Sequence, residues 1–322
     1  MLEKINNTIL FQGNLEKRHY FEGWYYKQVS RDERQVVSFI PGISLFKNNL
    51  HSFVQYIFVS LDENNNKTIQ TGYIKYPIEA FKFRNEPFMI KVGENIFSES
   101  MASVKLVDEK INIKGILKLG TLAHIEKSIL IPNIMGIFAY IPKMECYHSV
   151  ISMNHSLSGK LKINDSYVGF NSGKGYIEKD WGTSFPKQYI WIQCNNFKNK
   201  TISVFTSVAN IPFMKKSFRG YLCNFTIEGK EYRFATYNKS ILKIDEVSSK
   251  GVKLFLENKL AILKIEAIVD KTGELIAPEN GKMQKLIKEG LSGEVRISVF
   301  NKKTKVTYED VGFMAGIEIV NF

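Results

Sequence analysis

Two carboxylates stand two residues apart beside large aromatic side chains in the middle of the chain. They are Glu178 and Asp180, and Trp181 and Phe185 follow them closely. Residues two apart share one face of an extended strand, so both acids are expected to point the same way as Tyr176, while Trp181 points the other way. Burial disfavours the charged form of a carboxyl group and raises its pKa. The pattern therefore indicates a general acid, with Glu178 and Asp180 as candidates.

The same two acids also allow a structural interpretation. Carboxylates in this position could be bound by Lys179, by Lys187 or by backbone amides. Acids in unusual surroundings gather at functional sites, and this observation weighs as much as the structural alternative. Both interpretations stay open on the sequence alone.

A second segment near the N-terminus, with the sequence YFEGWYYK, repeats the combination of an acid and aromatic residues. Glu22, Trp24 and Tyr26 share one face if this segment is extended. Glu22 is therefore a further catalytic candidate. The alternative, which the sequence favours, is a carboxylate that ties the first strand to a nearby Arg or Lys.

Together the two segments resemble the tocopherol cyclase family. Its members carry an opening similar to YFEGWYFK and a later core similar to EKxWGxxFPxxxxWxQCNxF. This chain has the core as Glu178-Lys179-Asp180-Trp181-Gly182, Phe185-Pro186, Trp191, Gln193-Cys194-Asn195 and Phe197. The plant members carry Asn where this chain has Asp180, which makes Glu178 the better candidate. The resemblance extends over nearly the whole chain, to Glu318 near its end.

The resemblance implies an acid-catalysed ring closure. A carboxylic acid protonates an alkene of a prenyl chain, and a phenol oxygen attacks the tertiary cation to form a chromanol, so no cofactor is expected. Glu178 would donate the proton, and Asp180 or Glu22 would adjust the acidity of Glu178. The residues expected to contact the substrate are Trp24, Tyr26, Trp181, Phe185, Trp191, Gln193 and His148. For each aromatic residue core packing is the simpler alternative, and for His148 it is a structural hydrogen bond.

Two other classes of function remain open. A carrier with the same architecture would bind a hydrophobic small molecule without changing it. A surface-bound structural protein would instead use the basic charge of the chain. These classes differ from a cyclase in whether the acid at position 178 matters.

The length of the chain favours two domains. Its 322 residues exceed the 250 to 300 residues at which single cores stop growing. Trp24 and Trp191 each stand in an apolar segment that is followed by a second strand-like run, which is a faint internal repeat. The resemblance implies a pair of lipocalin-like barrels, and we expect them at residues 1–165 and 166–322.

Short runs of alternating apolar and polar residues predict a fold that is almost entirely antiparallel β-sheet. Turn sequences separate these runs at the spacing of a sandwich or barrel. One segment, Pro278 to Leu291, is predicted to be helical because its apolar residues fall at helical spacing. The predicted strands are Val36–Phe39, Phe53–Ser60, Thr68–Tyr76, Ala102–Leu106, Ile111–Leu117, Ser203–Val208, Tyr221–Ile227, Glu231–Thr236, Val252–Leu256, Ala261–Val269 and Gly293–Phe300.

Composition narrows the expected ligands and partners. The three cysteines and five histidines show no metal-ligand spacing, so neither a metal site nor a disulfide framework is expected. The net charge of +12 is spread over single lysines without an RNA-reading signature, so no nucleic acid is expected, although weak association with a membrane surface stays open. The expected partner is a hydrophobic small molecule. No secretory signal is visible, so a cytoplasmic location is expected, and the sequence leaves the oligomeric state undetermined.

Overall fold

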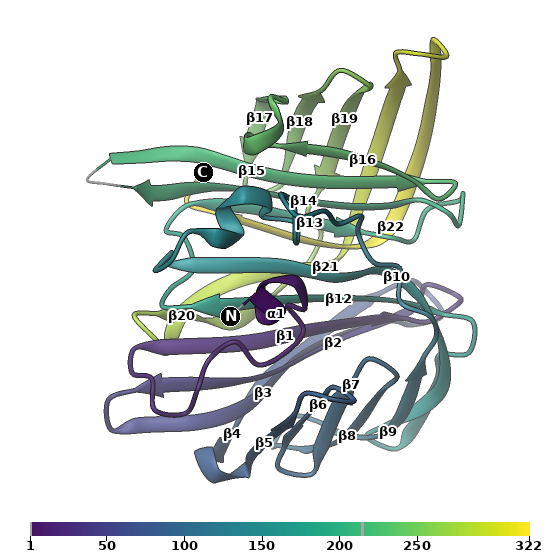
Figure 1. The fold of residues 1–322 in the computed structure, drawn as a ribbon. Helices are drawn as coiled ribbons and strands as arrows, with labels where there is room; N and C mark the ends of the chain where they lie inside the picture. Colours follow the sequence, from purple (N-terminus) through teal and green to yellow (C-terminus); the bar gives the residue numbers. More distant parts are fainter. Residues whose placement is uncertain (1, 214–215) are drawn as a thin grey trace. The chain divides into compact units, whose positions relative to one another are not determined.

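The computed structural model describes residues 2–213 and 216–322, and within them strands predominate. The chain forms two compact units (Figure 1). The first comprises Met1–Phe185 and Glu274–Ile287, and the second comprises Pro186–Gly273 and Lys288–Phe322. Each unit is described by itself below.

The first unit is built on one large antiparallel sheet. Its elements up to Phe185 are α1 (Leu2–Asn6), β1 (Tyr20–Val29), β2 (Gln35–Phe46), β3 (Asn49–Leu61), β4 (Lys67–Pro77), η1 (Ile78–Ala80), β5 (Phe81–Arg84), β6 (Met89–Val92), β7 (Asn95–Ser98), β8 (Met101–Val107), β9 (Asn112–Leu119), η2 (Gly136–Tyr140), β10 (Cys146–Ile163), β11 (Ser166–Gly169) and β12 (Lys174–Gly182). The strand order is β4-β3-β2-β1-β12-β10-β9-β8-β7-β6-β5, with β11 paired to β10.

The inner side of this curved sheet holds the first hydrophobic core. Large aromatic side chains fill it, and Trp24, Tyr26 and Phe39 are fully buried there. Long strands with alternating apolar residues favour such an arrangement, because each strand presents one complete apolar face to the core. The N-terminal segment adds Ile9 and Phe11 to the same core.

The second unit is built on the second antiparallel sheet. The remaining elements of the chain are β13 (Tyr189–Cys194), β14 (Ser203–Phe213), β15 (Lys216–Ile227), β16 (Lys230–Ala235), η3 (Thr236–Asn238), β17 (Ile241–Ser248), β18 (Gly251–Glu257), β19 (Ala261–Ile268), β20 (Thr272–Glu279), β21 (Lys282–Asn301) and β22 (Val306–Val320). The strand order is β16-β15-β14-β13-β22-β21-β19-β18-β17, with β20 paired to β21. Its core includes Ile190, Ile192 and Ile317.

The all-β antiparallel architecture predicted from the sequence is confirmed, and each predicted strand coincides with a strand of the two sheets to within one residue at the ends that overrun it. The helix predicted for Pro278 to Leu291 is wrong, because this segment forms the end of β20, a turn and the start of β21. Asn280 and Gly281 connect the two strands with positive φ angles of 52° and 80°. An Asn-Gly pair between two strands is a strong hairpin signal, and it outweighs the helical spacing. Accordingly Ile287 is buried while Leu286 is 65% exposed.

The compact units divide the chain later than residue 165. Strand β12 lies between β1 and β10 in the first sheet, so the first unit continues to Phe185. The hairpin segment Glu274–Ile287 also belongs to the first unit. The division into two lipocalin-like barrels at residues 1–165 and 166–322 stays a prediction.

Among the residues that the structure describes, no helix is long and apolar enough to cross a membrane.

Candidate functional site

Alternate residues of strand β12 lie on opposite faces of the first sheet. Ile177 and Trp181 lie in the hydrophobic core, so this side is called the core face. Tyr176, Glu178 and Asp180 alternate with them and lie on the other side, which is called the acid face. The alternation predicted from the sequence is therefore present.

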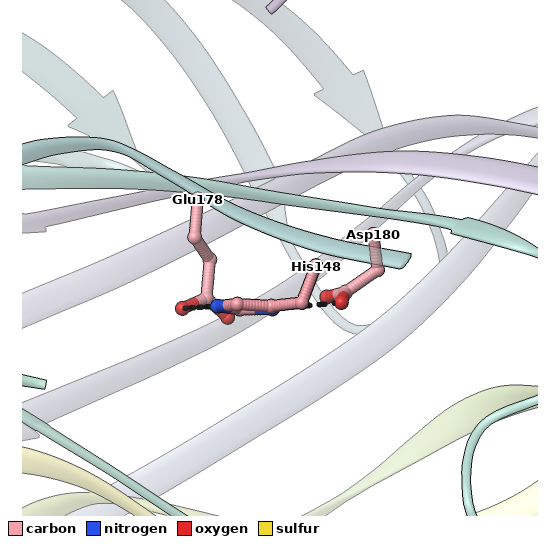
Figure 2. A group of neighbouring side chains, drawn as sticks. All are labelled: His148, Glu178 and Asp180. Atoms are coloured by element: carbon pink, nitrogen blue, oxygen red, sulfur yellow. Dashed lines mark hydrogen bonds and ion pairs between the residues drawn. The ribbon is translucent and has the colours of Figure 1, made fainter. Parts of the chain in front are cut away.

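Strand β10 adds a histidine to the acid face. His148 lies directly opposite Asp180 in the register of β10 and β12. Its Nδ1 is 2.8 Å from Oδ1 of Asp180, and its Nε2 is 3.8 Å from Oε2 of Glu178. Figure 2 shows the imidazole ring between the two carboxylates. The structure thus brings together Glu178, Asp180 and His148, three of the residues predicted for the site.

The group is mostly out of contact with water, with the His148 and Asp180 side chains 14% and 20% exposed. Glu178 is 5% exposed, and Tyr176 is completely buried. The Tyr176 hydroxyl donates a hydrogen bond of 2.6 Å to Oε2 of Glu178. Burial and the neighbouring Glu178 raise the pKa of Tyr176 well above its usual value of 10.0, so this phenol stays a neutral donor. The Cys146 thiol lies 3.9 Å from Asp180, and burial together with that carboxylate raises its pKa too.

The two carboxylates determine the charge of the imidazole. Burial alone would lower the pKa of His148, but the negative charges of Asp180 and Glu178 and the hydrogen bond with Asp180 raise it above its ordinary value of 6.5. His148 therefore holds a proton more tightly than a free histidine does. Asp180 orients the ring, and the other ring nitrogen faces Glu178.

This arrangement can move a proton. The separation of 3.8 Å between Nε2 of His148 and Glu178 is an ion-pair contact that is longer than a hydrogen bond. Catalytic hydrogen bonds are often long without substrate and tighten when it binds. Glu178 could therefore give a proton to a reactant and regain one from His148.

The same three residues could instead hold a metal ion. One ligand atom from each of His148, Glu178 and Asp180 lies within 4.8 Å of the others, and a histidine with two carboxylates suits a divalent cation. A cation at Nδ1 of His148 would have to displace the bond with Asp180. No metal site was expected from the sequence, because His148 lies far from the two acids in the chain and only the pairing of β10 with β12 brings the three residues together.

Glu22 lies on the core face and belongs to a different group. Its carboxylate is 2.5 Å from Nζ of Lys179, and both side chains are fully buried. Glu22 also accepts hydrogen bonds from the backbone N–H groups of Gln12 and Gly13, at 2.8 and 3.0 Å, and from the Tyr20 hydroxyl. It is therefore the structural carboxylate that the alternative interpretation describes, and the structure does not bring it to Glu178.

Trp24 and Trp181 surround the lysine of this pair. Nζ of Lys179 lies 4.5 Å from the ring centre of Trp24 and 5.1 Å from that of Trp181. The lysine also donates hydrogen bonds to the backbone carbonyls of Thr8 and Leu10. The two indole rings thus stabilise a cation of the protein itself.

The other predicted contact residues lie in three places. Tyr26 is in the first core beside Phe97. Phe185 is half-buried and packs edge-on against Phe21, which lies on the acid face, with ring centres 5.5 Å apart. Trp191 and Gln193 are buried in β13 of the second unit.

Trp24, Tyr26 and Trp181 are separated from Glu178 by the sheet, which contradicts the prediction of one common wall around that acid. Tyr176 and Lys179 are important residues that the sequence prediction of the site did not include. The alternation in Tyr176-Ile177-Glu178-Lys179 was the signal that could have assigned them to opposite faces.

Solved structures with a similar fold come from proteins of very different sequence. The crystal structure of CghA with Sch210972 has a TM-score of 0.63 at 8% identity, and the alignment covers 94% of this chain and 88% of that one. Kievitone hydratase from Nectria haematococca has a TM-score of 0.54 at 10% identity, with 93% and 88% covered. A putative AttH from Nitrosomonas europaea has a TM-score of 0.56 at 10% identity, with 92% and 91% covered. These similarities concern the fold, which is of the lipocalin type.

Sequence comparison gives the family. The chain is 25% identical over 195 residues to a probable chloroplastic tocopherol cyclase of Oryza sativa subsp. japonica, covering 57% of this chain and 41% of the relative. It is 24% identical over 177 residues to a chloroplastic tocopherol cyclase of Zea mays, covering 52% and 36%. The chain thus matches about two fifths of the length of these curated relatives. The model of the tocopherol cyclase-like family matches residues 96–320, and the chain therefore belongs to that family.

Proposed function

We propose that this protein is an acid-catalysed cyclase that closes an oxygen-containing ring in a prenylated quinol or a similar hydrophobic small molecule. The observation that carries the proposal is a histidine held between two carboxylates, His148 between the buried Glu178 and the partly buried Asp180. Membership of the tocopherol cyclase-like family supports the same chemistry. The reaction is an isomerisation.

Glu178 is the proton donor in this proposal. The protonated carboxyl group adds its proton to the less substituted carbon of a trisubstituted alkene, which leaves a tertiary cation. The phenol oxygen of the same molecule attacks that cation, and the phenol proton leaves to a carboxylate or to His148. Every atom of the substrate is kept and the proton returns, so the step requires neither an oxidant nor a reductant.

The surroundings of Glu178 suit this role. A buried acid has few waters that could capture the cation before the ring closes. His148 can return a proton to Glu178 because its Nε2 lies 3.8 Å from Oε2 of that carboxyl group, and the raised pKa of His148 favours the protonated ring. Tyr176 fixes Oε2 of the carboxyl group, the oxygen that faces Nε2 of His148.

The direct test compares wild-type protein with Glu178→Gln on a set of prenylated hydroquinones. Product is detected by liquid chromatography and mass spectrometry, since a cyclised product has the mass of the substrate but no free phenol at the ring position. We expect wild-type turnover and a loss of about 100-fold or more in the variant. Gln is nearly isosteric, so thermal unfolding should change little and serves as the folding control.

A carrier would give a different result in the same experiment. Both proteins would bind the hydroquinone with similar affinity, measured by quenching of tryptophan fluorescence, and neither would release a cyclised product. Binding without turnover by any substrate of the set would therefore reject the cyclase in favour of the carrier.

A further inference from the structure

The segment 128–140, between β9 and β10, presents several large apolar side chains to solvent. Ile129 is 88% exposed and Leu130 is 69% exposed, while Ile137 and Tyr140 are 50% and 40% exposed. Single exposed apolar residues are ordinary, but a group of them marks a surface for interaction. These four residues are called the apolar tip.

The tip has a defined conformation. Ser128 and Ile131 exchange two backbone hydrogen bonds of 2.9 and 3.0 Å, so Ile129 and Leu130 occupy the two positions at the end of a tight turn. Gly, Asn and Asp are the usual residues there. The Tyr140 hydroxyl donates a hydrogen bond of 2.5 Å to the Ile129 carbonyl and ties the turn to η2.

A buried anchor supports the tip from below. Ile134 is completely buried and Asn133 is 3% exposed. The Asn133 amide donates to the Ile5 carbonyl at 3.1 Å, and its oxygen accepts from the Met135 N–H at 2.9 Å. The anchored residues Asn133 and Ile134 thus fix the base of the tip, and its apolar side chains stay exposed to solvent.

We propose that the apolar tip docks the first unit onto an anionic lipid surface. The tip carries exposed aliphatic side chains at the end of its turn and a tyrosine at its border, a combination that suits the acyl chains and the headgroup level of a membrane. Lys127 and Lys143 flank it and are exposed, although Glu126 and Glu145 balance them. The net charge of +12 supplies long-range attraction to anionic headgroups, and insertion of Ile129 and Leu130 supplies the binding itself.

The tip continues directly into the candidate site. The backbone N–H of His148 donates to the sulfur of Met135 at 3.3 Å, and the Tyr147 hydroxyl donates to the Ile141 carbonyl at 2.8 Å. A docked tip would therefore hold β10, the strand that carries His148, near a source of membrane-dissolved substrate. This link to substrate rests on the proposed function, whereas the docking itself does not.

The test measures sedimentation of the purified protein with phosphatidylcholine vesicles that contain or lack phosphatidylserine. We expect wild-type binding that is stronger with phosphatidylserine, and a loss of at least about tenfold in the partition coefficient for Ile129→Ser/Leu130→Ser, because two inserted aliphatic side chains are lost. The matched control is Leu260→Ser/Val306→Ser, which removes aliphatic residues that are 47% and 60% exposed in the second unit. This control should bind as the wild type does.

Three results would overturn the docking proposal. The wild type could fail to sediment with either vesicle. The tip variant could bind as well as the control, with salt alone removing both, which would indicate adsorption through scattered lysines. Light scattering could instead show that the tip joins two copies of the chain. Glu178→Gln should sediment normally, so a failed cyclase test and a failed docking test give distinguishable results.

Discussion

Glu22 and Glu178 lie on neighbouring strands of one sheet, both almost completely buried, and yet they have different surroundings. Glu22 is paired with Lys179, whose pKa is lowered by burial to about 8 but which is still mostly charged at pH 7. Glu178 faces His148, an imidazole that can both accept and give up a proton and whose pKa the two carboxylates raise. Burial alone therefore does not make an acid catalytic. The partner decides whether the proton can move.

The largest expected effect concerns the Glu22–Lys179 pair and the free energy of unfolding. Lys179→Met should lower the free energy of unfolding by about 3–5 kcal/mol, because it leaves the buried Glu22 carboxylate without its cation. Urea denaturation followed by tryptophan fluorescence measures this change. The double variant Glu22→Gln/Lys179→Met should recover part of the loss.

The matched control for that experiment is Lys162→Met. Lys162 makes a surface ion pair of 3.8 Å with Asp165, whose side chain is fully exposed. Such pairs contribute about 0–1 kcal/mol, so this variant should unfold nearly as the wild type does. Equal effects of the two lysine substitutions would contradict the structural role assigned to Glu22.

On the acid face, Asp180→Asn should slow cyclisation by about tenfold to hundredfold. It removes a charge-assisted hydrogen bond to His148, and such bonds contribute roughly 1.5–3 kcal/mol. Asp180 is also one of the groups that raise the pKa of His148, so this pKa should fall in the variant. Activity that needs protonated His148 decreases as pH rises through that pKa, and the basic limb of the pH profile should therefore move to lower pH.

A merely structural role for Asp180 would leave a different signature. The rate would fall at all pH values without any displacement of the basic limb. For stability the sign is the same as for activity: the raised pKa of His148 stabilises the folded state at low pH, and this contribution is lost as pH rises through it. Asp180→Asn should weaken that pH dependence of unfolding.

The sequence predicted the two acids and their common face because strand alternation is a local property. Glu178 and Asp180 follow from a period of two within β12. The partnership with His148 does not, because it depends on the pairing of β10 with β12, which joins His148 to Asp180 at a sequence separation of 32, and on register shifts in β10. Pairing between distant strands is set by the whole sheet, and no local pattern encodes it.

The same limit explains the incorrect common wall. The prediction placed Trp24 and Trp181 around Glu178 because the two sequence motifs each combine an acid with tryptophan. Their own alternation places them on the core face, where they pack around Lys179. The incorrect helix at 278–291 has another origin, since an Asn-Gly turn and sheet pairing overrode a helical spacing of apolar residues.

A smaller effect is expected from Tyr176→Phe. The substitution removes a neutral hydrogen bond of 2.6 Å to Glu178, and bonds of this kind contribute about 0.5–1.5 kcal/mol. Cyclisation should slow by about twofold to tenfold while the substrate KM stays nearly constant, because Tyr176 is buried behind the acid. Tyr73→Phe is the matched control, since that hydroxyl bonds to His51 at 2.8 Å elsewhere in the sheet. A change confined to KM would mean that Tyr176 contacts substrate.

The smallest effect, none at all, is expected from chelation, and it separates the two uses of the acid-face group. If His148, Glu178 and Asp180 serve as a proton relay, Nδ1 of His148 stays bonded to Asp180, and EDTA leaves both the rate and the unfolding temperature unchanged. If the three residues hold a divalent cation, chelation lowers both, and added Mn²⁺ or Zn²⁺ restores them. Elemental analysis of the purified protein provides an independent measurement, because bound metal at one equivalent would contradict the relay even before any substrate is known.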